Sequence, residues 1–239
     1  MNSISFLIKP ASSLCNMDCR YCLYKDVVDH REIPSYNIMR EDTMQALIKQ
    51  ALGLYQDITF AFQGGEPTLS GLSFYRAFIA YVNQYKTNQN IHYAIQTNGL
   101  SINDEWCAFF KENHFLVGIS LDGYKDNHDF LRLDGKGNPT YTKVIQAMNL
   151  LKKHDVEVNV LIVLTSYLAK HPQKLFQWIL KHQLHYVQFI PCLPPLQGTT
   201  RYALTPKLFA SFYKTFFNDW FEEVQKGNVK TKRYQYLAG

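Results

Sequence analysis

The chain has 239 residues, of which 46% are apolar, 15% aromatic and 19% charged. This composition excludes a disordered, fibrous or coiled-coil protein and suits one large core. The net charge is only +5 and the lysines are spread along the sequence, so neither nucleic acid nor a membrane is an expected partner. No stretch approaches about 18 consecutive apolar residues. Because the N-terminus lacks a secretory pattern, we expect a cytoplasmic protein.

Short runs rich in β-branched and aromatic residues alternate with longer amphipathic stretches along the chain. The expected strands are Ser5–Lys9, Asp57–Phe62, His92–Gln96, Leu116–Ser120, Glu157–Leu164 and Tyr186–Ile190. The expected helices are Glu41–Leu54, Leu72–Lys86, Asp104–Asn113, Tyr141–His154, Pro172–His182 and Pro206–Gln225. Helix caps are predicted at Ser70, Asn103, Thr140 and Thr205. Several of the strands are apolar on both faces, which is typical of a buried parallel sheet.

Small and polar residues, with potential metal ligands among them, collect after the carboxyl end of each expected strand. Residues 10–22 follow the first strand in this way, and residues 63–71 follow the second. In a barrel such loops share one rim, where barrel enzymes carry their active sites. A doubly wound sheet needs fewer polar loops. The predicted fold is therefore α/β, a partial (β/α)6 TIM-like barrel in one domain.

Cys15, Cys19 and Cys22 form a C-x3-C-x2-C motif in the loop after the first expected strand. Three thiolates this close together can hold three corners of a cuboidal iron–sulfur cluster, and one iron stays open because no fourth cysteine lies nearby. Other interpretations are a zinc site completed by His30, a redox pair of Cys19 and Cys22, or cysteines that are close by chance. The spacing favours the cluster.

The cysteine motif resembles that of radical S-adenosylmethionine (SAM) enzymes, C-x3-C-x-aromatic-C, with Tyr21 in the aromatic position. The sequence Gly64-Gly65-Glu66-Pro67 is similar to the GGEP motif of that family, whose backbone binds the SAM amino group. The resemblance implies that Cys15, Cys19 and Cys22 bind a 4Fe–4S cluster. It also implies that SAM binds the open iron and is cleaved reductively to a 5′-deoxyadenosyl radical.

The resemblance extends to three further positions in the loops after the expected strands. It implies that Ser120 contacts the SAM ribose, that Arg132 lies near the SAM carboxylate and that Leu193 helps to hold the adenine. A side chain at Gly65 is expected to obstruct SAM and to leave the cluster intact, because backbone must approach the ligand there.

Over essentially all of its length the chain resembles the anaerobic sulfatase-maturating enzymes. The segments that carry this resemblance include IKPASSLCNMDCRYCLY, AFQGGEPTLSGL, QTNGLSINDEW and VQFIPCLPP. They imply an oxidoreductase that converts a Cys or Ser of a sulfatase to Cα-formylglycine, with an electron donor such as flavodoxin or ferredoxin. Tyr24, Gln63 and Gln96 point to the same rim and are candidates for substrate contact. Polar residues that merely end buried strands would show the same pattern.

Members of that family continue into a cysteine-rich domain that holds two auxiliary 4Fe–4S clusters and the proposed general base, an aspartate. These 239 residues contain no such cysteines. We therefore expect residues 1–239 to form a single radical SAM barrel domain, with residues 205–239 as its last helix and the start of a connection. SAM binding is thus better supported than full turnover. The alternatives are another radical SAM peptide-modifying maturase and a truncated, non-catalytic Fe–S and SAM-binding domain.

Several remaining residues are expected to be structural. Cys107 is predicted to be a core thiol, whereas Cys192 either faces substrate or is simply packed. His128 is expected in a loop and His154 at a helix end. The aromatic stripe of the last helix is expected to belong to the core or to seat a further domain.

Overall fold

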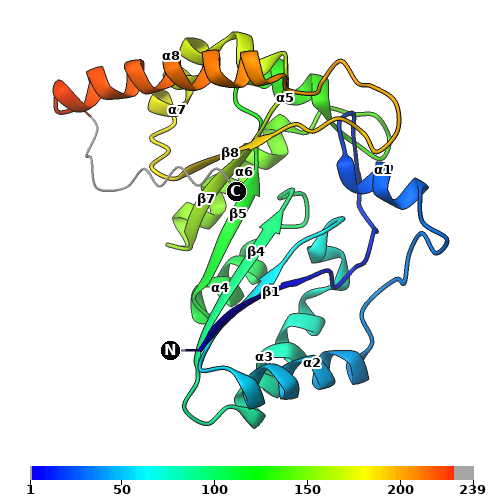
Figure 1. Ribbon diagram of the computed structural model, residues 1–239. Helices are drawn as coiled ribbons and strands as arrows, with labels where there is room; N and C mark the ends of the chain where they lie inside the picture. The colour runs from blue at the N-terminus through cyan, green and yellow to red at the C-terminus, as the bar shows by residue number, and fades with distance from the viewer. Residues whose placement is uncertain (1, 229–239) are drawn as a thin grey trace.

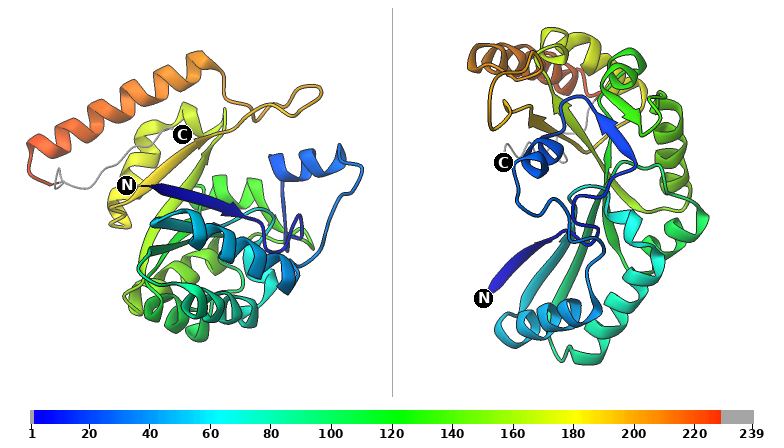
Figure 2. Two further views of the ribbon diagram at one scale, coloured as in Figure 1. Left: turned by 60° about the horizontal axis from the view of Figure 1, so that its bottom comes forward. Right: turned by 90° about the vertical axis from the view of Figure 1, so that its right-hand side faces the viewer.

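The computed structural model describes residues 2–228. The main sheet has the strand order β1-β3-β4-β5-β7-β8 and curls into an open half-barrel (Figures 1 and 2). All neighbouring strands in it are parallel, which confirms the predicted partial (β/α)6 barrel. The strands are β1 (Ser3–Ile8), β3 (Asp57–Phe62), β4 (Asn90–Thr97), β5 (Phe115–Ser120), β7 (Glu157–Leu164) and β8 (Val187–Pro191).

Long helices follow the strands in turn and lie on the outer side of the curved sheet (Figure 2). They are α2 (Glu41–Leu54), α3 (Leu72–Tyr85), α4 (Asp104–Glu112), α6 (Tyr141–Lys153), α7 (Pro172–Lys181) and α8 (Pro206–Gln225). Four short elements that the sequence did not predict lie in the loops after strands: α1 (Leu23–Asp29), η1 (Pro67–Ser70), α5 (Lys125–Leu131) and η2 (Leu168–Lys170). Elements this short give no readable hydrophobic period.

Strand β3 shows how the sheet divides its two faces. Ile58, Phe60 and Phe62 alternate along the strand and are buried against the helices, while the residues between them are partly exposed. The ring of Phe78 on α3 lies 5.0 Å, centroid to centroid, from both phenylalanine rings. Truncation of such a ring to alanine costs about 3–5 kcal/mol. One face of the sheet thus forms the core, and the other lines the concave side of the half-barrel.

Two of the predicted helix caps are confirmed. The Asn103 side chain accepts a hydrogen bond from the Trp106 backbone N–H at 3.0 Å, at the start of α4. The Thr205 hydroxyl accepts one from the Leu208 N–H at 3.3 Å, at the start of α8. Both side chains thereby satisfy an N–H group that has no partner inside its helix.

Of the other two predicted caps, Ser70 is wrong, whereas Thr140 holds the predicted N-cap position but makes no capping hydrogen bond. Ser70 lies inside η1 and donates its hydroxyl to the Pro67 carbonyl, and the cap of α3 is Gly71, whose φ of 79° favours glycine. Thr140 precedes α6, but its hydroxyl donates to the Arg132 carbonyl at 2.8 Å and caps no helical N–H. In both cases a local hydrogen bond outside the helix takes the side chain.

A second sheet, which the sequence did not predict, ties the cysteine loop to a distant segment. It consists of two antiparallel strands, β2 (Met17–Cys19) and β6 (Arg132–Asp134), in which Cys19 pairs with Arg132. The backbone N–H of Arg20 continues the contact by donating to the Leu131 carbonyl at 2.9 Å. This ribbon positions the second cysteine.

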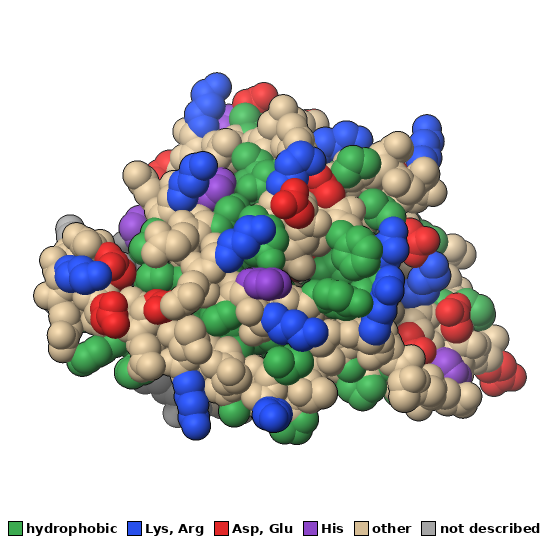
Figure 3. All heavy atoms as spheres, turned by 90° about the horizontal axis from the view of Figure 1, so that it is seen from above, with side chains coloured by type: hydrophobic (Ala, Val, Ile, Leu, Met, Phe, Trp, Pro, Cys, Tyr) green, Lys and Arg blue, Asp and Glu red, His purple; other side chains and the backbone are tan. Residues whose placement is uncertain are grey.

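Helix α8 divides its aromatic stripe between core and surface. Phe212 and Phe216 are buried, with their rings 5.2 and 5.0 Å from that of Phe189 on β8, whereas Phe217 and Phe221 are exposed. On the end of the molecule that carries α8, basic side chains are scattered among acidic ones and hydrophobic side chains gather in patches (Figure 3). Residues 229–239 of the predicted connection lie outside the described residues.

Three single-residue predictions are settled by burial and position. Cys107 is fully buried on α4, as expected for a core thiol, and His154 follows the last turn of α6. The loop assignment of His128 is wrong, because this residue lies in α5 and is fully buried. Within residues 2–228, no helix combines the length and the apolar character that a membrane span requires.

Candidate functional site

A cavity of about 590 Å³ opens at the carboxyl ends of the strands. Its size lies within the range of cofactor and small-molecule pockets. Every residue that the sequence singled out for cluster, cofactor or substrate contact lines it: Cys15, Cys19, Tyr21, Cys22, Tyr24, Gln63, Gly64, Gly65, Glu66, Gln96, Ser120, Arg132 and Leu193. The fold thus brings together residues from loops far apart in the sequence, as the barrel prediction requires.

The three clustered cysteines approach the cavity from one loop. Cys15 precedes β2, Cys19 ends β2, and Cys22 is the residue immediately before α1; all three are free thiols. The Cys15 sulfur accepts a hydrogen bond from the Met17 N–H at 3.4 Å, and the Asn98 amide nitrogen lies 3.9 Å from the same sulfur. These donors favour a thiolate, which is the form that binds metal.

The donor set fits a cluster better than a single ion. Within residues 2–228, no three His, Cys, Asp or Glu side chains converge on one metal position. His30, the fourth ligand of the zinc interpretation, does not line the cavity that the three cysteines share. A cuboidal cluster puts each thiolate on a different iron and needs no such convergence. Cys15, Cys19 and Cys22, exposed to one cavity, therefore meet the requirement for a 4Fe–4S cluster.

Burial makes the free thiolates costly in the protein alone. It raises the pKa of Cys19 to about 12 and also raises the pKa of Cys15. The Arg132 guanidinium acts in the opposite direction on Cys19, whose sulfur lies 4.0 Å from its Nη1. A bound cationic metal centre supplies the positive charge that stabilises the deprotonated sulfurs.

The Gly64-Gly65 turn packs directly on the cysteine loop. A Cβ atom at Gly65, where φ is +51°, would overlap the Leu14 carbonyl oxygen and lie 2.9 Å from the Ser13 carbonyl carbon. The next residue, Glu66, donates its N–H to that Leu14 carbonyl at 2.7 Å. A side chain at Gly65 would therefore displace the cysteine loop. This contact argues against an intact cluster in such a variant, and iron analysis of a Gly65 variant tests the expectation.

The carboxylate of Glu66 is buried and fully used inside the protein. Its Oε1 accepts from the Thr68 N–H at 3.0 Å, from the Thr68 hydroxyl at 2.7 Å and from the Thr97 hydroxyl at 2.8 Å. Its Oε2 accepts from the Asn98 N–H at 2.7 Å. Burial nonetheless raises the pKa of Glu66. The side chain thus joins the ends of β3 and β4. Because both carboxylate oxygens are already hydrogen-bonded inside the protein, a ligand in the cavity would contact the backbone of Glu66.

Asp122 is a central residue of the site that the sequence analysis did not identify. Its carboxylate is fully buried and accepts a hydrogen bond from the Tyr21 hydroxyl and another from Arg132 Nε at 2.9 Å. Its Oδ1 also accepts from the Val163 N–H on β7 at 2.9 Å. The available signal was an aspartate two residues after the end of strand β5, in the segment 120–123.

His128 connects the backbones of Asp122 and Arg132. The Asp122 N–H donates to His128 Nδ1 at 3.2 Å, and the Thr140 hydroxyl donates to the Arg132 carbonyl. Because that hydroxyl proton is used, Thr140 accepts from His128 Nε2–H at 3.0 Å, which assigns the proton to Nε2. Burial lowers the pKa of His128 to about 4, so the ring is neutral at pH 7.

The three substrate candidates have side chains available on the cavity wall. Tyr24 on α1 is 37% exposed, and Gln63 and Gln96 are half-buried at the ends of β3 and β4. Among the described residues, none of these three side chains forms a hydrogen bond within the protein, which leaves their polar groups free to bind a ligand. Ser120 and Cys192 are buried in the wall, so Cys192 is both packed and in contact with the cavity.

Fold and site together define a half-barrel of the type that holds an iron–sulfur cluster through one loop and a second ligand beside it. The sequence model of the Radical SAM superfamily matches residues 10–179. The chain therefore belongs to the radical SAM superfamily, whose characteristic cofactors are SAM and a 4Fe–4S cluster.

Similarity to curated proteins and solved structures supports a narrower relationship. The cysteine-type anaerobic sulfatase-maturating enzyme of Clostridium novyi is 44% identical over 98% of this chain and 64% of its own length. The serine-type enzyme of Bacteroides thetaiotaomicron is 31% identical over 91% of this chain and 57% of its own. The solved structure of native anSMEcpe with bound AdoMet and Cp18Cys peptide matches this fold with a TM-score of 0.88 and 40% sequence identity. The match covers 95% of this chain and 62% of that one. The chain thus spans less than two thirds of these relatives.

Proposed function

We propose that this protein binds a 4Fe–4S cluster and SAM and removes a hydrogen atom from the Cβ of a peptidyl Cys or Ser, which is then oxidised to Cα-formylglycine. The observation that carries the proposal is the single cavity in which the cysteine loop, the glycine turn and the three further loop positions meet. The relatives of both the cysteine type and the serine type support the reaction class.

The cavity residues divide into cofactor-binding and structural groups. Cys15, Cys19 and Cys22 hold the cluster, which together with SAM supplies a 5′-deoxyadenosyl radical that can remove a hydrogen atom. Ser120 contacts the SAM ribose, and Leu193, 59% exposed on the rim, covers the adenine.

The remaining cofactor contacts surround the cysteine loop. Arg132 lies near the SAM carboxylate, and its buried pairing with Asp122 fixes the guanidinium in place. Tyr21 donates to the same carboxylate and so holds the aromatic position of the motif beside the cluster. The backbone of Gly64 and Gly65, continued by that of Glu66, provides the polar groups for the SAM amino group.

The substrate is proposed to be a segment of a sulfatase that enters the concave side of the half-barrel. Tyr24, Gln63 and Gln96 orient it, because their polar groups face the cavity and have no protein partner among the described residues. Positioning of the reacting carbon and exclusion of water are the protein's main contributions to such a reaction. An electron donor such as flavodoxin or ferredoxin would supply the electron that this chemistry requires. In this proposal, residues 1–239 belong to one barrel domain. The cytoplasmic location is a separate prediction from the sequence.

Deuterium transfer tests the proposal at the reacting atom. The protein, reconstituted anaerobically with iron and sulfide, is incubated with SAM, a strong reductant and a C-x-P-x-R peptide whose cysteine carries deuterium on Cβ. We expect deuterium in the 5′-deoxyadenosine, measured by mass spectrometry. A peptide deuterated on Cα should give unlabelled nucleoside.

The contrary outcomes identify the rival functions. Deuterium transferred only from Cα, or a crosslinked peptide product, would indicate a different peptide-modifying maturase. SAM that remains uncleaved in the presence of reductant and a full complement of iron would indicate a non-catalytic binding domain.

A further inference from the structure

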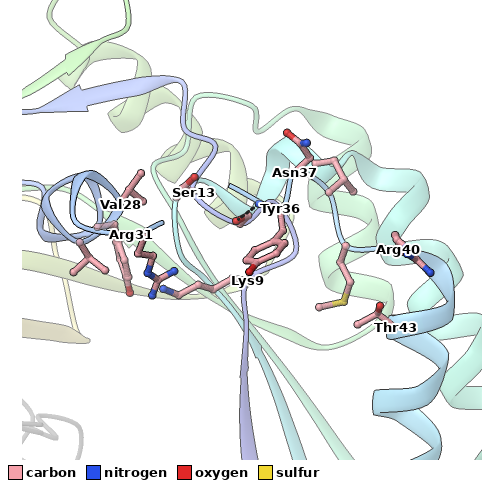
Figure 4. A pocket seen from close by; sticks show the side chains of 14 residues that line it. Lys9, Ser13, Val28, Arg31, Tyr36, Asn37, Arg40 and Thr43 are labelled. Carbon is pink, nitrogen blue, oxygen red and sulfur yellow. Dashed lines mark hydrogen bonds between the residues drawn. The ribbon is translucent and has the colours of Figure 1, made fainter. Parts of the chain in front are cut away.

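A second cavity, of about 460 Å³, adjoins the cofactor cavity. Its walls come from the end of β1, from α1 and from the segment 31–43 (Figure 4). Tyr24 and Gly65 line both cavities, so the two share a wall. A ligand that extends from the cofactor cavity past Tyr24 reaches this second space.

Two cationic side chains meet inside the second cavity. Figure 4 shows the side chains of Lys9 and Arg31 directed toward one another. The methylene chain of Lys9 packs over Gly64, where an added Cβ would lie 2.6 Å from Lys9 Cγ. Its ammonium lies 4.5 Å from the centroid of the Tyr24 ring. The glycine turn and the Tyr24 ring therefore hold the lysine in place.

Neither cation has an acidic partner among the described residues, since no ion pair joins Lys9 or Arg31 to a carboxylate there. Arg40, which lines the same cavity, differs because it pairs with Asp42. Burial and the nearby Arg31 charge lower the pKa of Lys9, which is the direction expected for a cation beside another cation. An anion between the two groups would relieve this repulsion.

The rest of the lining suits an organic anion more than an inorganic one. Val27 and Val28 from α1 and Ile38 and Met39 from the following segment give the cavity an aliphatic wall. A carboxylate carried on a short aliphatic chain matches both the cations and this wall, whereas phosphate would leave the wall unused.

We propose that Lys9 and Arg31 form a subsite for a carboxylate side chain of the polypeptide substrate, next to the residue that reacts. This assignment takes one element from the proposed function, namely that the ligand is a polypeptide. Since Tyr24 lies in the shared wall, the carboxylate occupies one side of this ring while the reacting residue occupies the other.

Binding measurements with matched peptides test the subsite. C-x-P-x-R peptides carry a single Glu, or Gln as the uncharged control, at each variable or flanking position in turn. Their affinities for the anaerobically reconstituted protein with SAM are measured by fluorescence anisotropy. At one position or a few adjacent ones we expect Glu to bind at least about fivefold more tightly than Gln, since two cations act on one carboxylate. The preference should weaken at high ionic strength.

Variants with equal loss of charge separate the subsite from general electrostatics. The double substitution Lys9→Met and Arg31→Gln should abolish the preference for Glu. The control, Lys49→Met with Arg76→Gln, should retain it, because neither residue lines the cavity. Lys49 on α2 lies 4.7 Å from the centroid of the Tyr85 ring on α3, and Arg76 pairs with Glu105. All variants are compared at equal iron and SAM content, so that a folding defect is not mistaken for lost recognition.

Three results would overturn the proposal. One is equal binding of Glu and Gln peptides at every position, and another is a preference that persists in the Lys9 and Arg31 variant. The third is binding of free glutarate or phosphate as tight as that of the best Glu peptide, which would assign the subsite to a free anion. Deuterium transfer from the peptide Cβ would stand in all three cases, so failure here is distinct from failure of the proposed function.

Discussion

Asp122 is the residue at which the cofactor cavity and the barrel wall are joined. It contacts Tyr21 in the cysteine loop, Arg132 in β6 and Val163 in β7, and its own backbone lies in the loop that follows β5. A buried carboxylate of this kind is stable only while its partners are present, and removal of one partner of a buried pair costs about 3–5 kcal/mol. The network therefore fixes Arg132 beside the cysteine loop, and loss of any one partner should lower the stability of the fold.

The assignment of the cluster ligands makes a simple prediction. Anaerobically reconstituted Cys19→Ala should lose its iron and the broad absorption near about 400 nm, because a cluster with three protein anchors does not tolerate the loss of one. Cys107→Ala should keep both, since this thiol lies in the core of α4. Complete iron loss in Cys107→Ala or Cys192→Ala would show that the ligands are wrongly assigned.

His128 should give stability a dependence on pH above the range where carboxylates titrate. The pKa of His128 falls from about 6.5 in the unfolded chain to about 4 in the folded protein. Between pH 6.5 and pH 4 the ring therefore gains a proton in the unfolded chain and stays neutral in the folded protein. Stability present at pH 7 is therefore lost as pH falls. We expect the free energy of unfolding of the cluster-free protein to be lower at pH 5 than at pH 7 by about 2 kcal/mol.

Urea titrations at both pH values check this expectation. His128→Gln should be less stable at pH 7 and should show a smaller difference between pH 7 and pH 5. His92→Gln, at an exposed position on β4, should keep the difference of the parent protein. An unchanged difference in His128→Gln would show that another group is responsible.

At the scale of elements, the glycine turn and the cysteine loop behave as one unit. Gly65→Ala would overlap the Leu14 carbonyl and so should reduce iron content and also weaken SAM binding by at least about tenfold. Gly137→Ala is the matched control, because φ is +80° there and an added Cβ meets nothing within 4 Å. Iron analysis and SAM binding are measured on both. Full iron with weakened SAM binding would instead favour direct contact between the turn and SAM.

The elements that were predictable from the sequence are those whose pattern is local and long. Strand Glu157–Leu164 has the predicted bounds because its apolar run continues over most of its eight residues. Helix Glu41–Leu54 has the predicted bounds because its apolar residues recur with the helical period over several turns. The β2–β6 ribbon was not predictable, since each strand has three residues and the partner lies more than a hundred residues away. Asp122 was missed for the same reason: its role depends on partners from other loops.

At the scale of the whole molecule, the half-barrel holds the cofactor residues, while its relatives are longer. In the sulfatase-maturating enzymes that the sequence resembles, the proposed general base and the auxiliary clusters are expected in a further cysteine-rich domain. General-base assistance is commonly worth about 10²–10⁴ in rate. We therefore expect residues 1–239 alone, with strong reductant, to form 5′-deoxyadenosine slowly and little formylglycine on a C-x-P-x-R peptide.

Mass spectrometry of peptide and nucleoside from one reaction measures the ratio of these products. The Cys19→Ala variant should form neither. Formylglycine produced in step with 5′-deoxyadenosine would show that the base lies on the rim of this barrel.

The ribbon that pairs Cys19 with Arg132 also links cluster loading to the mobility of a remote segment. Opening of β2 must break the pairing of β6, which runs directly on from α5. Since regions that open cooperatively exchange their amide protons together, loading of the cluster should slow hydrogen exchange at residues 125–134 as well as in the cysteine loop. Amide exchange in α5 would then report occupancy of a metal site whose cavity this helix does not line.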